Sequence, residues 1–180
     1  MEYVDVLDKD GKLTGERKPK SEVHRTGDWH RVLHLWIVSS KGELLLQRRS
    51  PTKEAYPNLW DISVAGHISA GETQIMAALR EAKEEIGLDL EEKDLKHLFC
   101  ITEQVVLNGG TYHDNECQYV YLFEKDIDLS KISFKDGEVV DARYISYKEL
   151  EKTVAANPKD FVPHAEEYRL LFKELHKRYS

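Results

Sequence analysis

The chain of 180 residues has little cysteine and no long hydrophobic run. Its two cysteines, Cys100 and Cys117, are expected to be ordinary strand residues in a reduced protein. No apolar stretch approaches the ~18 residues that a helical membrane span requires, which excludes such a span. Residues 1–10 are polar and acidic, so no secretory signal is expected. These absences predict a cytoplasmic protein.

Positive charge is scarce relative to negative charge. There are 26 Lys and Arg against 33 Asp and Glu, which gives a formal net charge of −7. We therefore expect neither nucleic acid nor a membrane as a partner, because both are polyanionic surfaces. A phosphorylated small molecule is still compatible, since a bound divalent cation inverts the local field. Whether the chain forms a homodimer stays open at this point.

The remaining composition is ordinary for a globular domain. Apolar residues make up 41% of the chain and charged residues 33%, and the length suits a single domain with a sizeable core. No internal repeat, low-complexity tract or linker interrupts it. We expect one domain over residues 1–180, with a short N-terminal β-hairpin extension over about 1–30.

Apolar periodicity predicts the order of strands and helices. Alternation and turn residues predict strands at 3–7, 34–39, 43–47, 60–68, 98–107, 118–123 and 138–145. A period of 3.6 predicts helices at 73–86, 147–156 and 163–179. An Asn-Gly-Gly turn at 108–110 favours a hairpin between two of the strands. The order of strands, one helix, more strands and two helices predicts a mixed α/β or α+β domain.

The helix expected at 73–86 carries three carboxylates on one face. Glu81, Glu84 and Glu85 project within roughly 100° of one another, and like charges at this spacing repel. Arg80, four residues before Glu84, neutralises only part of this charge. A hard cation such as Mg²⁺ would neutralise the rest, because it takes carboxylate oxygens and completes its shell with water and phosphate. The alternative is a solvated helix face without a ligand.

The N-terminal end of the same helix suits an anion. Backbone amides near Gly71 and Glu72 would face a phosphate group. A metal bridging phosphate oxygens acts as a Lewis acid and activates water for in-line attack. The pattern therefore favours a diphosphate–metal site.

The spacing around these glutamates resembles the Nudix box. All seven fixed positions of the box match over residues 66–88, namely Gly66, Glu72, Arg80, Glu81, Glu84, Glu85 and Gly87. Ala82 is the one departure, because the family prefers a larger aliphatic residue there. The resemblance implies a Nudix fold, an α/β (α+β) domain with a mixed central β-sheet sandwiched between α-helices. It also implies a hydrolase that cleaves the P–O–P linkage of a small nucleoside-diphosphate-linked or related organic diphosphate.

The resemblance also implies roles for the box residues. Glu84 and Glu85 would be the principal ligands of Mg²⁺ or Mn²⁺, and Glu81 would be a further ligand or the general base. Arg80 would orient the glutamates by salt bridges. Outside the helix, Glu72 would support the loop, and the carbonyl oxygen of Gly66 would join the metal shell.

Two further features concern the substrate. Arg48 and Arg49 would clamp a diphosphate, since guanidinium groups favour bidentate phosphate contacts. They would equally serve as the polar end of an edge strand. Trp29, Trp36 and Trp60 are candidates for base stacking, but the last two lie in apolar strand patterns and are expected in the core.

Segments outside the box resemble the Nudix branch that contains type I isopentenyl diphosphate isomerase. The similar segments are LLLQRR at 44–49, YPNLW at 56–60, GH at 66–67, NP at 157–158 and F-x-P at 161–163. In that branch a His/Glu cluster binds a metal, and the approximately matching positions here are His24, His30, His67, Asp114 and Glu116. A second, His/carboxylate-bound metal is implied, and mixed imidazole and carboxylate ligands suit Zn²⁺ or Mn²⁺ better than Mg²⁺ alone. The alternative for His24 and His30 is simple surface exposure.

Two positions argue against isomerase chemistry. The isomerase cysteine before the Gly-His pair is Ala65 here, which has no ionisable group, and the aromatic residue after F-x-P is His164, a poorer partner for a carbocation. A hydrolase is therefore the leading interpretation, and an isomerase-like enzyme or a non-catalytic Nudix ligand-binding domain are the alternatives. Substrate choice is expected in the N-terminal segment, residues 105–115 and the C-terminal helices.

Overall fold

The computed structural model describes residues 1–135 and 137–179. Its N-terminal part is an antiparallel hairpin of β1 (Tyr3–Leu7) and β2 (Leu13–Pro19), followed by the short helix α1 (Lys20–Thr26). The sequence predicts the hairpin but not α1, because seven residues are too few to display an apolar repeat. The helix ends at Gly27, whose φ of 77° lies in the left-handed region that glycine adopts readily.

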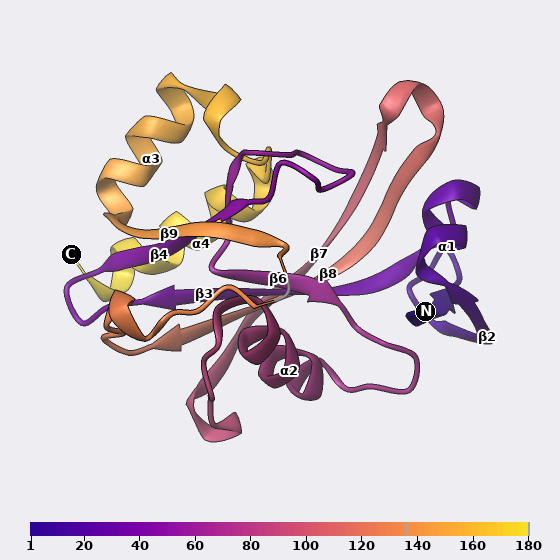
Figure 1. The fold of residues 1–180 in the computed structure, drawn as a ribbon, viewed down its shortest axis with the longest axis horizontal. Helices are drawn as coiled ribbons and strands as arrows, with labels where there is room; N and C mark the ends of the chain where they lie inside the picture. The colour runs from indigo at the N-terminus through magenta and orange to yellow at the C-terminus, as the bar shows by residue number, and fades with distance from the viewer. Residues whose placement is uncertain (136, 180) are drawn as a thin grey trace.

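A seven-stranded mixed sheet forms the centre of the molecule (Figure 1). Its strands are β3 (His30–Val38), β4 (Glu43–Arg49), β5 (Trp60–Asp61), β6 (Val64–His67), β7 (Leu95–Leu107), β8 (Tyr112–Glu124) and β9 (Val139–Ser146). The main path runs β5-β4-β3-β8-β7, while β6 pairs with β3 and β9 pairs with β4. β3 and β8 are parallel, and the other pairs are antiparallel.

Three strands differ from the prediction in ways that matter for the site. β3 begins at His30 rather than at residue 34, and β8 begins at Tyr112 rather than at residue 118. The two early ends lie side by side, since His30 is the register partner of Glu116. The single strand expected over 60–68 is divided into β5 and β6. Between them the buried Ser63 side chain donates to the Leu45 carbonyl, which interrupts the pairing.

Helices cover both faces of the sheet. One face packs on α2 (Gln74–Ile86), and its apolar cluster joins Leu33, Leu35 and Ile37 of β3 to Ala78 and Ala82 of the helix. The other face packs on α3 (Tyr147–Ala156) and α4 (Ala165–Arg178). Alternate β3 residues therefore serve opposite layers, as a strand requires. The predicted mixed sheet between helices is confirmed.

Several smaller features complete the fold. Short 3₁₀ turns lie at Glu92–Asp94, Asn108–Gly110, Leu129–Lys131 and Pro158–Asp160. Trp36 is fully buried and Trp60 packs against the same cluster, as predicted. Cys100 and Cys117 are strand residues with free thiols. Within the described residues, every helix is too short or too polar to span a bilayer.

Candidate functional site

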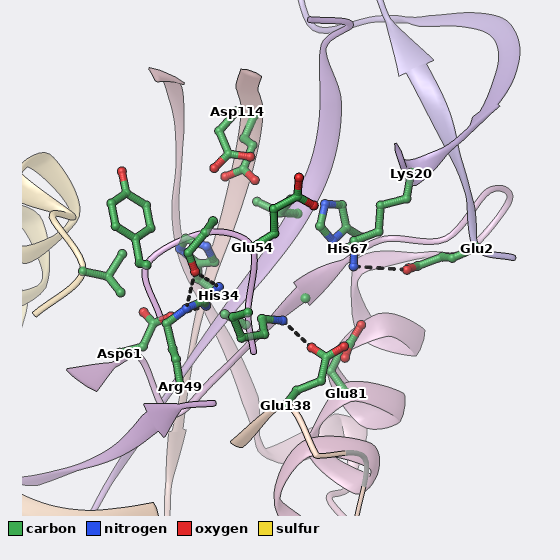
Figure 2. A pocket seen from close by; sticks show the side chains of 18 of the residues that line it. Glu2, Lys20, His34, Arg49, Glu54, Asp61, His67, Glu81, Asp114 and Glu138 are labelled. Atoms are coloured by element: carbon green, nitrogen blue, oxygen red, sulfur yellow. Dashed lines mark hydrogen bonds and ion pairs between the residues drawn. The ribbon is translucent and has the colours of Figure 1, made fainter. Parts of the chain in front are cut away.

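A cavity of about 810 Å³ opens where β6, the C-terminal half of α2, the early part of β8 and residues 52–56 meet. Figure 2 shows its labelled side chains converging from distant parts of the chain: Glu81 comes from α2, Asp114 from β8, and Lys20 and Glu2 from the N-terminal elements. Strands β3, β6 and β8 contribute lining residues, as do α2 and the loop over residues 52–56. This volume suits a small organic molecule.

The local sequence of α2 explains how its carboxylates reach this cavity. Thr73 caps the helix by accepting from the Met76 amide at 3.2 Å, and Gly87 ends it with a φ of 73°. Ala78 and Ala82 are fully buried against the sheet. Burial of this apolar stripe fixes the rotation of the helix, which places Glu81 and Glu84 in the cavity lining.

Arg80 holds this part of the site together. Its guanidinium makes a bidentate pair with Glu72 at 3.0 and 2.9 Å, and its Nη1 donates to Glu81 at 2.7 Å and Glu84 at 3.1 Å. Its Nη2 also donates to the His67 carbonyl at 3.0 Å. One side chain therefore fixes the loop, the helix and the end of β6 relative to one another.

Gly66 is required by the close approach of Glu81. A Cβ atom at residue 66 would lie 2.1 Å from the Glu81 Cδ and 2.2 Å from its Oε1, distances that no real side chain tolerates. Glu81 is 9% exposed, and burial raises the pKa of its carboxyl group to about 7 even though Arg80 opposes the shift. A carboxyl group with this pKa is suited to accept and release a proton near neutral pH.

The other two glutamates of α2 have different environments. Glu85 is buried, and its Oε2 accepts from the Ala65 amide at 3.1 Å and from Gln47 Nε2 at 3.3 Å. Burial raises the pKa of Glu85 well above its ordinary value, and the charge of Glu81 adds to this effect. The Glu84 side chain is 53% exposed. The helix therefore presents one open, one nearly buried and one buried carboxyl group.

Three histidines from separate elements meet beside these glutamates. His24 of α1, His30 of β3 and His67 of β6 each offer a ring nitrogen, and these atoms all lie within 4.8 Å of one another. Nε2 of His24 lies 3.0 Å from Nε2 of His67. His24 and His30 are 3% and 0% exposed, so the alternative that they are surface residues is wrong.

Carboxylates from β8 complete this cluster. Asp114 Oδ1 lies 3.1 Å from His24 Nδ1, and Glu116 Oε1 lies 3.9 Å from His30 Nε2. Burial lowers the pKa of His30 to about 4 and that of His67 well below its usual range, and it raises the pKa of Glu116 to about 7. His30 Nε2 is buried without a hydrogen-bond partner. The three imidazoles, the unpartnered Nε2 of His30 and the adjacent carboxylates form a donor set that fits a divalent metal ion.

In the described residues, groups of three metal-capable side chains within 4.8 Å occur twice, and neither group contains the three α2 glutamates. Glu81 and Glu84 instead share the Nη1 atom of Arg80. The second group is His34, His164 and Glu167. Sequence reasoning missed it as a group, because its members come from β3, the start of α4 and the helix itself.

Basic side chains also line the cavity. Arg49 is paired with Asp61 at 2.8 Å, Lys53 with Glu138, and Lys20 with Glu2 at 3.4 Å. Arg48, by contrast, is exposed and donates to the Asn58 carbonyl at 3.3 Å, outside the cavity lining. Successive residues of a strand point to opposite faces, so Arg49 lines the cavity and Arg48 does not.

Sequence reasoning did not find Lys20 or Lys53 as cavity residues. Lys53 lies in a loop between two prolines, and Lys20 begins the helix that had no periodic signal. Nothing in the local pattern of either segment indicates that its lysine turns inward. Only the three-dimensional path of the chain brings both to the same cavity.

Comparison with known proteins identifies relatives over most of the chain. A family model described as "NUDIX domain" matches residues 28–165. "Nudix hydrolase 3" of Arabidopsis thaliana is 40% identical in an alignment of 182 positions that covers 98% of this chain. The match spans only 24% of that plant protein.

Two other proteins match this chain over most of their own length. An isopentenyl-diphosphate Delta-isomerase of Pectobacterium atrosepticum is 31% identical over 158 residues, 88% of this chain and 84% of that protein. The crystal structure of DR0079 from Deinococcus radiodurans superposes with a TM-score of 0.72 at 22% identity, and covers 99% of this chain and 100% of that one. The structural likeness concerns the fold.

Proposed function

The chain belongs to the Nudix family, and from that premise we propose that it is a metal-dependent hydrolase that cleaves the P–O–P linkage of a small organic diphosphate. The observation that carries this proposal is one cavity lined by Glu81 and Glu84, by His67 with Asp114 and Glu116, and by basic side chains. Acidic and imidazole groups suit metal ions, and the basic groups suit the phosphates that those ions would bind.

The α2 glutamates would hold Mg²⁺ or Mn²⁺. Glu84 is open to the cavity, and Glu85 stands behind it with one oxygen bound to the Ala65 amide. A bound divalent cation supplies Lewis-acid chemistry and lowers the pKa of water. Glu81 would either join these ligands or act as the general base, and its pKa of about 7 suits proton transfer. Arg80 would keep Glu81 oriented through their 2.7 Å hydrogen bond.

The histidine cluster would hold a second metal ion. His24, His30 and His67 supply three nitrogens, and the unpartnered Nε2 of His30 supports this assignment. Asp114 and Glu116 would add oxygen ligands. Such a mixed set favours Zn²⁺ or Mn²⁺ over Mg²⁺.

Four basic residues would bind the diphosphate. Arg49, Lys53, Lys20 and Arg80 line the cavity from four different segments. Each is paired with a carboxylate in the described structure, so each is held in place before a ligand enters. Preorganised cations lower the entropic cost of binding an anion.

An isomerase-like enzyme is the second candidate, favoured by the Pectobacterium relative. Ala65 lines the cavity at the position of the isomerase cysteine and offers no proton. His164 lines it as well and is bound to Asp61 at 2.9 Å, so it is no cation-stabilising aromatic surface. A non-catalytic ligand-binding domain is the third candidate. It has no need of the carboxylates that line this cavity.

Turnover of a substrate panel tests the proposal. Nucleoside di- and triphosphates, ADP-ribose, a nucleotide sugar and isopentenyl diphosphate are incubated with Mg²⁺ and separately with Mn²⁺. Phosphorus NMR detects P–O–P cleavage, and proton NMR detects double-bond migration. We expect metal-dependent cleavage that disappears in Glu84→Gln, while the control Glu151→Gln, at a residue outside the cavity lining, retains it. A shifted double bond with intact diphosphate would establish the isomerase instead.

The same measurements distinguish the third candidate. Ligand affinity that persists in Glu84→Gln without any turnover by the unmodified protein would favour the binding domain.

A further inference from the structure

Two buried carboxylate–imidazole pairs lie side by side at one end of the cavity. Nδ1 of His34 lies 2.6 Å from Oε2 of Glu167, and both side chains are buried. The second oxygen of Glu167 accepts from Trp36 Nε1 at 2.7 Å. Both carboxylate oxygens are therefore occupied, and the imidazole ring of His34 is held in one orientation between β3 and α4.

The second pair is built in the same way. Nε2 of His164 lies 2.9 Å from Oδ1 of Asp61. Asp61 also accepts from Arg49 at 2.8 Å and from the Ile62 amide at 2.8 Å. The rings of His34 and His164 approach edge to face, with centroids 5.1 Å apart.

Each imidazole keeps one nitrogen free. Nδ1 of His164 is buried and has no partner, and the described structure gives Nε2 of His34 none either. Both residues line the cavity. Figure 2 shows His34 next to Asp61 and Arg49, at the end of the cavity away from Lys20 and Glu2. An unsatisfied buried nitrogen costs about 1–3 kcal/mol, and a ligand oxygen would remove that cost.

We propose that His34 and His164 form a subsite that hydrogen-bonds an oxygen atom of the organic group attached to the diphosphate, so that the substrate carries a sugar-like or nucleoside group and not a hydrocarbon. The inference rests on the proposed function, because it takes the diphosphate to lie near the α2 glutamates. His34 and His164 are thus specificity-determining residues and take no part in bond cleavage.

The rest of the lining agrees with a polar ligand. Its carbon-rich side chains are small or carry a hydroxyl group, and they are Val32, Ala55, Ala65, Val162, Tyr56 and Tyr112. Among the described residues, the lining contains no Leu, Ile, Phe, Met or Trp. A branched hydrocarbon would gain little apolar contact here and would leave both ring nitrogens unpaired.

A metal ion is the other ligand that this geometry permits. His34, His164 and Glu167 have ligand atoms within 4.8 Å of one another. A metal bound by one Glu167 oxygen would compete with the hydrogen bond that this oxygen already accepts, either from His34 or from Trp36. The structure therefore favours the hydrogen-bonding role, and metal binding is an outcome that the experiment must detect.

The experiment compares two kinds of substrate that share a terminal diphosphate. One kind is the nucleoside diphosphates ADP, CDP, GDP and UDP, and the other is isopentenyl diphosphate. The ratio of their kcat/KM values is measured for the unmodified protein, for His34→Leu and for His164→Gln. His176→Leu is the matched control, because this histidine pairs with Glu151 at 2.9 Å on the surface and lies outside the cavity.

We expect the unmodified protein to prefer a nucleoside diphosphate, and His34→Leu to lower this preference about 10- to 100-fold, as the loss of a charge-assisted hydrogen bond predicts. His164→Gln should lower it as well, so the test does not depend on one variant folding. An equal fall for both substrates, or an unchanged ratio, would overturn the inference. Loss of one bound Mn²⁺ or Zn²⁺ in His34→Leu, measured by metal analysis, would also overturn it in favour of a metal site.

Failure of the proposed function has a different signature. If the unmodified protein cleaves no diphosphate, the same ligands are compared by their dissociation constants. The inference then stands if His34→Leu weakens binding of the nucleoside diphosphate relative to that of isopentenyl diphosphate. It falls if the ratio of the two dissociation constants is unchanged. The hydrolase and the subsite are thus decided by separate measurements.

Discussion

Gly66→Ala should lower the activity of the protein strongly while leaving its fold largely intact. The added methyl group would lie 2.1 Å from the Cδ of Glu81, and ordinary contact begins near 3.4 Å, so the carboxylate must retreat by about 1.3 Å. The clash falls on the end of the Glu81 side chain, so the carboxylate and not the backbone must move. Displacement of a catalytic group by about 1 Å can cost a hundredfold in rate, and we expect kcat/KM to fall about 100-fold.

Stability should change much less than activity. Gly66 has no positive φ, so alanine is compatible with its backbone and should stabilise the fold by about 0.4–1 kcal/mol. The 2.7 Å bond between Arg80 and Glu81 would be lost, at a cost of about 1 kcal/mol. The two effects nearly cancel, and the Tm should shift by no more than about 4 °C.

A double-mutant cycle decides whether the clash with Glu81 is the cause. In a Glu81→Ala background the obstructing carboxylate is gone, so Gly66→Ala should change the residual kcat/KM by less than about twofold. Steady-state rates and thermal melts are measured for all four proteins. A normal rate in Gly66→Ala, or an equal loss in both backgrounds, would refute the reasoning.

Three further predictions follow from the side chains around the cavity. Arg80→Lys should lower the Tm by roughly 4–8 °C, because lysine cannot make the bidentate pair with Glu72 and about 2 kcal/mol is lost; an unchanged melt would contradict this. Burial lowers the pKa of His34, but the charge of Glu167 outweighs this effect and raises the pKa to about 9 from an ordinary 6.5. The His34–Glu167 pair should therefore stabilise the fold fully below pH 6.5 and lose that contribution as the pH rises through 9. Urea unfolding should show a slope of up to about 1.4 kcal/mol per pH unit in this window, absent from His34→Phe. Finally, the apparent Mn²⁺ affinity should rise between about pH 6 and 8, because burial raises the pKa of Glu81 to about 7 and this carboxyl group must lose its proton to bind the metal. Calorimetry in buffers of different ionisation enthalpy should detect the released proton. An affinity that does not change with pH would count against Glu81 as a ligand.

Local patterns were sufficient to predict most of the fold. The apolar stripe predicts α2 within one residue of its observed bounds, and α3 has the predicted bounds. The prediction of a Nudix hydrolase is confirmed at the level of family membership. These features depend on residues close together in sequence, where periodicity and capping act directly.

The cavity itself depends on long-range packing, which a pattern does not specify. The sequence did not predict residues 30–33 as part of a strand. They pair with β8, but this long-range pairing leaves no alternation of apolar and polar residues in the local sequence. His34 was predicted to be a strand residue, and nothing in the sequence joins it to Glu167, 133 positions away. The roles of the box residues and of the histidine cluster stay predictions, to be decided by the variants above.

The parallel pairing of β3 with β8 has a consequence for the order of folding. His30 and Glu116 are register partners that lie 86 positions apart, and His24 and His67 come from two further elements. A contact between such distant positions closes a large loop, and we expect it to form late in folding because closing the loop costs chain entropy before the contact is made. A partly folded chain would therefore have no histidine cluster, and a metal ion could bind there only after the strands had found each other. Binding at this cluster would report that β3 has paired with β6 and β8.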